Sequence, residues 1–305
     1  MPGPFDPRDE KAYHEWRRRK LAARPRSLEA LAVEVPDPRR PGPALGAVRA
    51  ACARANACLV RFPRPLSKAE LRAFAALLGL RRLDRNPCAD EDAVTSLRVR
   101  VGGPHRGYIP YSDRPLSWHT DGYYNPPERT VRAFVLHCVR PAAEGGESLL
   151  MDHELAYIDL RDEDPALVEA LMAPDAMTIP PNEAPEAARG ARAGPVLWVE
   201  GGRLRLRYTA RARNVVWKGD PLVRAAAARL RTLPERRPEW VLRRRLRPGE
   251  TLVTNNVLHA RTGFRDGADG GRLLYRARYH DPIDTAGEAA GTEGELPRCS
   301  GSASC

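Results

Sequence analysis

Short strand-like segments recur along this chain from about residue 94, and they constrain its fold more than any other feature. The segments are rich in β-branched and aromatic residues and are bounded by Gly, Pro and Asn, which is typical of strands ended by turns: TSLRVRV, VRAFVLHCV, SLLMD, PVLWVE, LRLRYTA, ETLVTN and RLLYRARY. Helical patterns at 166–172 and 221–233 interrupt them. Many short strands with long connections favour a sandwich or jelly roll over a parallel sheet. We therefore predict an α+β fold whose β core spans residues 94–284.

The first 93 residues differ in character and are predicted to form a helical and α/β section that packs on this core. Residues 8–22 have the charged, amphipathic pattern of a helix, and CLVRF at 58–62 is typical of a short strand. Ser67 and Glu70 have the spacing of a capping box, which predicts a helix to about residue 78.

The last stretch, residues 285–305, is small and polar, and we predict a disordered tail there. The sequence does not define a role for residues 1–40, nor for Cys299 and Cys305 within the tail. It also leaves the oligomeric state open, with a homo-oligomer among the options.

The charge of the chain limits its partners. Lysine and arginine total 50 against 39 aspartate and glutamate residues, a net charge of +11. Such a balance fits nucleic acid, an acidic surface or an anionic substrate. No zinc-finger spacing or aromatic-rich RNA-binding pattern accompanies it, so a solvated Arg-rich face is favoured over nucleic-acid binding.

The sequence lacks two features that would place a protein in a membrane or direct it to secretion. No apolar run approaches the roughly 20 residues that a membrane helix needs. The N-terminus, MPGPFDPRDEKAYHEWRRRK, lacks the apolar core of a secretory signal. We therefore expect a cytoplasmic protein that acts on a small molecule and has no membrane contact.

A histidine and an aspartate stand two positions apart in SWHTDGYYN, as His119 and Asp121. Residues i and i+2 of an extended segment point to the same side, so both side chains can bind one metal. This tripeptide alone is a weak signal, and His259 in NNVLHARTGF supplies a third ligand. Two histidines and a carboxylate leave three open positions, as in non-haem iron(II) oxygenases. Zinc hydrolases use a similar set, so these residues leave the metal open.

Arginines follow His259 in GRLLYRARY. Arg272 and Arg276 project from one face of a regular strand. A guanidinium binds a carboxylate through two parallel hydrogen bonds, so this face suits a diacid that chelates a metal through its other end. A basic outer face of the strand is the alternative.

Four motifs, WHTD, LHCVRPAAEGGESLLMD, NNVLHARTGF and GRLLYRAR, occur in this order over about residues 95–280. Together they resemble the taurine dioxygenase superfamily of Fe(II)/2-oxoglutarate-dependent dioxygenases, and the second motif is most similar to its gamma-butyrobetaine hydroxylase branch. The resemblance implies an oxidoreductase with a double-stranded β-helix (jelly-roll) core and flanking and inserted helices. It also implies Fe(II), the cosubstrate 2-oxoglutarate, O2, and release of succinate and CO2. The N-terminus lacks the Cys/His zinc cluster that often begins that branch.

The resemblance also implies roles for individual residues. His119, Asp121 and His259 match the catalytic iron ligands. Arg272, which is 13 positions after His259 (272 − 259), matches the arginine that binds the distal carboxylate of 2-oxoglutarate. Ser148 occupies the position of an assisting threonine, and Arg276 matches a second arginine that contacts the cosubstrate or the substrate.

Residues around the metal motif bear on the substrate. Trp118, Tyr123, Tyr124 and Asn125 flank it, and aromatic faces there suit a quaternary ammonium through cation–π contacts, unless these rings are core residues. Arg211 is a candidate anchor for a carboxylate or sulfonate. We expect a small charged metabolite, with a betaine or amino-acid derivative favoured and a sulfonate or other anion as the alternative. Its identity, and whether it is hydroxylated or oxidatively cleaved, stay open.

The competing hypotheses for the function are a zinc or manganese jelly-roll enzyme without 2-oxoglutarate, and a non-enzymatic basic scaffold that binds nucleic acid.

Overall fold

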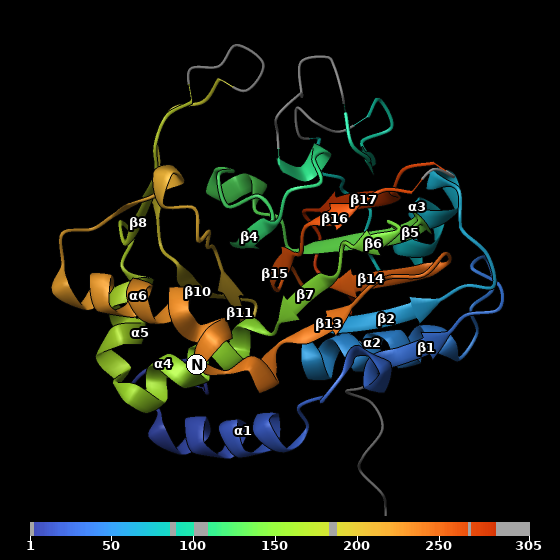
Figure 1. Ribbon diagram of the computed structural model, residues 1–305. Helices are drawn as coiled ribbons and strands as arrows, with labels where there is room; N and C mark the ends of the chain where they lie inside the picture. The colour runs from blue at the N-terminus through green and yellow to red at the C-terminus, as the bar shows by residue number, and fades with distance from the viewer. Residues whose placement is uncertain (1–2, 86–89, 101–108, 183–187, 268–269, 285–305) are drawn as a thin grey trace, which may run out of the picture.

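Two antiparallel sheets form the centre of the protein. The computed structural model describes residues 3–85, 90–100, 109–182, 188–267 and 270–284 (Figure 1). The larger sheet has six strands, in the order β1 (Ala32–Glu34), β2 (Ala57–Arg61), β14 (Glu250–Thr254), β5 (Ala133–Arg140), β17 (Leu273–Tyr279) and β3 (Thr95–Leu97). Only β1 and β2 run parallel among these pairs. The second has four strands, in the order β13 (Leu242–Arg244), β7 (Ser148–Met151), β15 (Leu258–Arg261) and β4 (Leu116–His119).

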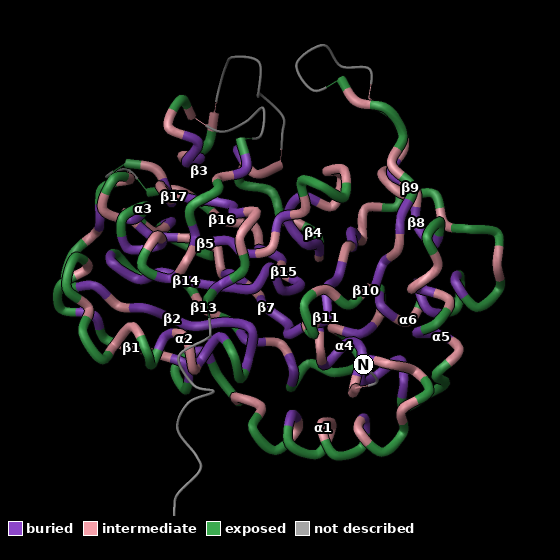
Figure 2. The backbone as a smooth tube through the Cα atoms, turned by 180° about the vertical axis from the view of Figure 1, so that it is seen from behind, coloured by how far each residue is buried: buried purple, intermediate pink, exposed green. Residues whose placement is uncertain are grey.

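The middle strands of the larger sheet are largely buried because both of their faces are covered. Every residue of β14 is buried, and β5 carries the apolar run AFVLHCV. Figure 2 shows these strands as a buried centre. On one side lies α2 (Ala44–Ala55), which packs Val48 and Cys52 into the same core as Leu252. The next helix, α3 (Lys68–Leu77), begins with the predicted capping box of Ser67 and Glu70.

A helical layer forms a second hydrophobic core beside the four-stranded sheet. It contains α1 (Glu10–Ala22), α4 (His153–Glu163), α5 (Pro165–Met172) and α6 (Pro221–Arg236). These helices pack with the short strands β8 (Met177–Ile179), β9 (Arg192–Gly194), β10 (Leu197–Glu200), β11 (Arg203–Leu206) and β12 (Val216–Trp217). The predicted α+β class with inserted helices is confirmed. Among the described residues, no ladder of hydrogen bonds joins the two main sheets into a closed barrel.

The predicted division at residue 93 falls between β2 and β3, two strands of one sheet. Residues on both sides of it share one hydrophobic core. The predicted tail, 285–305, lies outside the described residues. In the part of the chain that the structure describes, no helix is long and apolar enough to cross a membrane.

A buried lysine fastens the first helix to the rest of the protein. Lys20 Nζ lies 2.6 Å from Asp152 Oδ2, pairs with Glu154 as well, and donates to the carbonyl of Arg54 at 2.9 Å. Burial alone would lower the pKa of Lys20, but the two carboxylates raise it above its usual value. Asp152 is also the N-cap of α4, so one carboxylate joins both helices.

Candidate metal centre and its cleft

The three predicted ligands lie together where β4 and β15 meet. His119 and His259 are direct cross-strand partners, and their ring centroids are 4.2 Å apart. Asp121 follows β4 by two residues. One ligand atom from each of His119, Asp121 and His259 lies within 4.8 Å of the other two. This is a compact set of two imidazoles and a carboxylate, and it fits one metal ion.

Local hydrogen bonds orient both imidazole rings. His119 Nδ1 lies 2.8 Å from the carbonyl of Ser117, and His259 Nδ1 lies 2.9 Å from that of Val257. A carbonyl only accepts, so each Nδ1 carries the proton and each Nε2 keeps its lone pair. Burial lowers the pKa of His119 to about 3, with His259 acting in the same direction, and burial also lowers the pKa of His259. Both rings are therefore neutral near pH 7, which is the form that binds a metal.

The carboxylate of Asp121 has one occupied and one unsatisfied oxygen. Oδ1 accepts from Arg276 Nη1 at 3.1 Å and lies 3.6 Å from Arg278 Nη1. Oδ2 is buried and has no hydrogen-bond partner. Burial opposes ionisation of Asp121, but Arg276 and Arg278 hold its pKa well below its usual value. A buried anionic oxygen without a partner is costly, and a cation bound there would compensate it.

The turn that carries Asp121 is fixed from both sides. Its backbone N–H donates to Asn256 Oδ1 at 2.8 Å, and Asn256 Nδ2 donates to its carbonyl at 3.0 Å. The next residue, Gly122, has φ +69, and a Cβ there would lie 2.5 Å from Val131 Cγ2. Only glycine fits this position. The backbone conformation of the TDG turn thus determines where the carboxylate of Asp121 lies.

The residues predicted to bind the cosubstrate line a narrow cavity beside His259. Ser148, Arg272 and Arg276 line it together with apolar side chains: Leu97, Leu116, Phe134, Leu136, Leu150 and Leu252. The Arg272 side chain is almost fully buried, and its Nη1 has no partner. Burial lowers the pKa of Arg272 to about 10. No described carboxylate forms an ion pair with it, so an anion in this cavity would offset its burial.

The strand argument for these two arginines was too simple. The pairing register of β17 shifts between Leu273 and Leu274, so a bulge separates Arg272 from Arg276. Regular alternation does not pass through a bulge. Both side chains nevertheless line the same cavity.

Sequence reasoning missed Arg261 in this cavity. Its guanidinium lies 4.8 Å from the centroid of Phe264, and that of Arg272 lies 5.1 Å from it. Arg261 also donates to the carbonyls of Ser112 at 2.8 Å and of Arg114. Burial lowers its pKa to about 9, and Arg272 contributes in the same direction. The signal was present, because residue 261 stands two positions after His259 on a strand.

A wide cleft of about 610 Å³ opens on the metal ligands. Tyr123, Tyr124, Asn125 and Arg211, all predicted substrate residues, line it. Trp118 is not among the residues that line this cleft, and its side chain packs against the helical core. Its neighbour His119 faces the cleft, and consecutive residues of a strand point to opposite sides.

The cleft is strongly basic. Seven arginines line it against two aspartates: Arg85, Arg129, Arg189, Arg192, Arg211, Arg276 and Arg278, with Asp84 and Asp121. The ring of Tyr124 faces the protein's own guanidinium groups, with Arg278 at 5.8 Å and Arg189 at 5.9 Å from its centroid. This aromatic face is therefore already occupied by cations. The arrangement disfavours a quaternary ammonium substrate and favours an anion.

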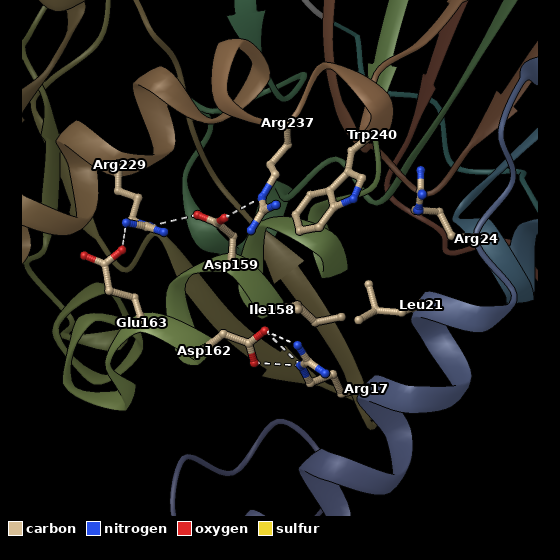
Figure 3. A pocket seen from close by; sticks show the side chains of 10 residues that line it. All are labelled: Arg17, Leu21, Arg24, Ile158, Asp159, Asp162, Glu163, Arg229, Arg237 and Trp240. Carbon is tan, nitrogen blue, oxygen red and sulfur yellow. Dashed lines mark hydrogen bonds and ion pairs between the residues drawn. The ribbon is translucent and has the colours of Figure 1, made fainter.

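A second hollow, of about 530 Å³, lies between α1, α4 and α6 (Figure 3). Its charges neutralise one another: Arg17 is 2.6 Å from Asp162, and Arg229 is 2.9 Å from Asp159. None of the unpartnered buried polar atoms of the described residues belongs to its lining, whereas Asp121, Arg272 and Arg276 all have one. The unsatisfied polar groups thus point to the metal centre as the functional site.

Known proteins resemble this chain in sequence and in fold. The profile of the family described as "Taurine catabolism dioxygenase TauD, TfdA family" matches residues 19–278. A uridine-5'-phosphate dioxygenase from Amycolatopsis sp is 34% identical over 173 residues, which are 53% of this chain and 60% of that protein. One from Streptomyces sp is 30% identical over 194 residues, or 62% and 69% of the two chains. The solved structure of an asparagine oxygenase with Fe(II), 2S,3S-3-hydroxyasparagine and succinate has a TM-score of 0.58 at 20% identity and covers 83% of each chain. At this identity the structural likeness shows a shared fold.

Proposed function

We propose that this chain, which belongs to the taurine catabolism dioxygenase TauD, TfdA family, is an Fe(II)- and 2-oxoglutarate-dependent dioxygenase whose iron is bound by His119, Asp121 and His259. The observation that carries the proposal is the unpartnered Oδ2 of Asp121 beside two imidazoles that each keep a free Nε2. When loaded, such a centre couples decarboxylation of 2-oxoglutarate to succinate and CO2 with insertion of one oxygen atom of O2 into a substrate C–H bond.

The residues of the chain have distinct roles in this proposal. Three protein ligands leave three positions for the cosubstrate and O2. Arg276 and Arg278 neutralise the carboxylate of Asp121 and hold its Oδ1, so that Oδ2 is presented to the metal. Asn256 fixes the backbone of Asp121 and therefore acts as a positioning residue.

The cavity beside His259 is the proposed site of the distal carboxylate of 2-oxoglutarate. Arg272 supplies an unpaired guanidinium and Ser148 a buried hydroxyl. The apolar walls exclude water and strengthen this ion pair. Arg276 lines this cavity as well as the wide cleft, so the cosubstrate and substrate sites adjoin at the metal. A metal enzyme without 2-oxoglutarate would leave Arg272 without a role.

The primary substrate is proposed to be a small anionic molecule that binds in the basic cleft. This differs from the betaine that the sequence favoured. The excess of arginine in the cleft supports it, and so do the names of the two uridine-5'-phosphate dioxygenases. We further propose that the six- and four-stranded sheets are the two layers of a double-stranded β-helix, as in the structural relatives.

An anaerobic titration tests the proposal. Apo-protein is titrated with Fe(II) in the presence of 2-oxoglutarate, and a visible charge-transfer band is expected. Asp121→Ala should abolish the band and the turnover while the circular dichroism spectrum stays native. Arg265→Gln is a suitable control because Arg265 is exposed and forms an ion pair with the exposed Glu144, away from the metal ligands and both cavities. Turnover retained by Asp121→Ala would refute the ligand assignment.

A further inference from the structure

We infer that Arg189 and Arg192 form a subsite for the phosphate group of a phosphomonoester substrate, an inference that rests on the proposed function. Both residues line the wide cleft that opens on His119 and Asp121. They belong to the arm that β8 and β9 form, two strands that lie side by side at one edge of the molecule in Figure 2. Arg192 pairs with Ile179 across the two strands, and Arg189 forms a further bridge with Asn182.

Like Arg85 and Arg211, and unlike the other arginines that line the cleft, these two form no ion pair with a described residue; they differ from Arg85 and Arg211 in standing together on the paired segments of β8 and β9. Arg276 and Arg278 pair with Asp121 and Asp84, and Arg129 lies 3.5 Å from Asp84. Among the described residues, no carboxylate forms an ion pair with Arg189 or with Arg192, and Arg192 Nε is buried without a partner. Within the described residues, two positive charges on one wall of the cleft therefore lack a compensating carboxylate.

The guanidinium of Arg189 is also held in place. It donates from Nη1 to the carbonyl of Pro180 at 2.6 Å and lies over the ring of Tyr124. Burial lowers the pKa of Arg189, and the positive charge of Arg192 lowers it further. A guanidinium anchored in this way loses little entropy on binding. A bound anion would remove the repulsion between Arg189 and Arg192.

The charge and geometry of the pair favour a phosphomonoester. Two uncompensated cations match a dianion, and a phosphomonoester carries a charge of about −1.5 to −2 near pH 7. A carboxylate or sulfonate carries one negative charge and would leave one guanidinium unpaired. Each guanidinium can bind two phosphate oxygens through parallel hydrogen bonds. The rings of Tyr123 and Tyr124 lie between this pair and His119, with centroids 5.2 Å apart and Tyr123 6.5 Å from His119. The phosphate and the metal thus lie at different places in one cleft.

Calorimetric titration of the protein loaded anaerobically with Fe(II) and 2-oxoglutarate tests this assignment. The probes are uridine 5'-monophosphate, uridine and inorganic phosphate. We expect the wild-type protein to bind the monophosphate at least about tenfold more tightly than uridine. Arg189→Gln and Arg192→Gln should each raise the Kd for the monophosphate about tenfold or more and leave the Kd for uridine unchanged. Arg213→Gln is the matched control, because Arg213 is exposed and lies outside the cleft lining.

The outcomes separate this inference from the function on which it rests. Inorganic phosphate that binds the wild type and is lost from both variants supports the subsite even if the nucleoside is the wrong one. Equal binding of the monophosphate by wild type and both variants overturns the assignment, and so does a wild type that binds neither phosphate probe. The charge-transfer band of iron and 2-oxoglutarate should persist in both variants. Its absence from the wild type would contradict the proposed function instead. Arg189→Lys, which keeps the charge, should recover part of the affinity and shows that the arm still folds.

Discussion

Arg278 and Asp84 form an ion pair in which both side chains are almost fully buried. The other amino group of Arg278 donates to the hydroxyl of Tyr124 at 3.0 Å and lies 3.6 Å from Asp121 Oδ1. Asp84 also accepts from Asn125 Nδ2 at 3.3 Å. The pair thus connects the carboxylate of Asp121, the proposed metal ligand, to the loop that follows it. Asp84 neutralises Arg278 through the amino group that does not face Asp121.

Removal of Asp84 should weaken both the fold and the metal site. In Asp84→Asn the buried Arg278 loses its main partner, which typically costs about 3–5 kcal/mol of unfolding free energy. The freed guanidinium is then expected to draw closer to Asp121 and compete with iron, raising the Kd for Fe(II). Urea denaturation of the apo-protein and iron titration measure the two effects. Asp175→Asn is the control, since Asp175 forms an exposed pair with Lys218 that should contribute little to stability. A loss of stability in Asp84→Asn no larger than that of the control would contradict the proposed link.

We predict that Arg272 lowers the stability of the apo-protein and is needed for binding of the cosubstrate. In Arg272→Met the buried, unpaired guanidinium is replaced by an apolar side chain, so the apo-protein should unfold at a higher temperature. The same change removes the proposed carboxylate partner and should raise the KM for 2-oxoglutarate about 100-fold, equivalent to about 2.8 kcal/mol. The KM for the primary substrate should stay within a factor of about two. Steady-state kinetics and differential scanning calorimetry measure these effects. An unchanged KM for 2-oxoglutarate would place the cosubstrate elsewhere.

Lys20 should contribute strongly to stability although it is far from the metal along the chain. Lys20→Met leaves Asp152 and Glu154 without their buried cation, and we expect a loss of about 3 kcal/mol of unfolding free energy. Lys11→Met is the matched control on the same helix, because Lys11 is exposed. Chemical denaturation of both variants gives the comparison. Equal stability of the two would show that the first helix is not held by this cluster.

His137 should make stability depend on pH. Burial lowers its pKa to about 4, whereas an unfolded histidine titrates near 6.5. Its Nε2 accepts from the backbone N–H of Leu66 at 2.8 Å, so the ring is neutral in the folded protein. Between these two pKa values the unfolded chain binds the proton and the folded chain does not. The contribution of His137 is therefore complete above about pH 6.5 and falls as the pH drops towards 4, by on the order of 2–3 kcal/mol.

Denaturation of the apo-protein between pH 4 and 7 measures this effect. His137→Gln keeps an acceptor for Leu66 but cannot titrate, so its unfolding free energy should fall less steeply over this range. His14→Gln serves as the control, because His14 is exposed. Parallel pH curves for wild type and His137→Gln would contradict the prediction.

The grouping of His119 with Asp121 and several strands could be predicted because their signals are local. His119 and Asp121 are two residues apart, and β5 contains the run AFVL while β14 contains Leu252 and Val253 between threonines. Two helices were missed for physical reasons. The N-cap of α2 is Pro43, which offers no side-chain cap, and α4 begins directly after the strand β7 with Asp152 as its cap. The proline-rich sequence before α2 and the lack of a loop before α4 removed the usual start signals of a helix.

The properties of the cleft could not be predicted in the same way. Whether an arginine is paired depends on carboxylates that are distant in sequence, as with Arg278 and Asp84, which are 194 residues apart. The unpaired state of Arg189 and Arg192 is visible only once all these partners are placed. By contrast, Arg261 stands two positions after His259 on β15, which pairs regularly with β7, so strand alternation would have assigned it to the same side.

The order of strands in the larger sheet affects how the chain can fold while it is being synthesised. β2 is complete once residue 61 has been made, yet its antiparallel neighbour β14 begins at residue 250. A ribosome adds about 5–20 residues each second, so the apolar edge of β2 waits on the order of ten seconds or more for its partner. The parallel neighbour β1 and helix α2 can cover only part of it meanwhile. We therefore expect chains that terminate before β14 to aggregate or to be held by chaperones, with the proposed metal centre assembling only after β15 has emerged from the ribosome.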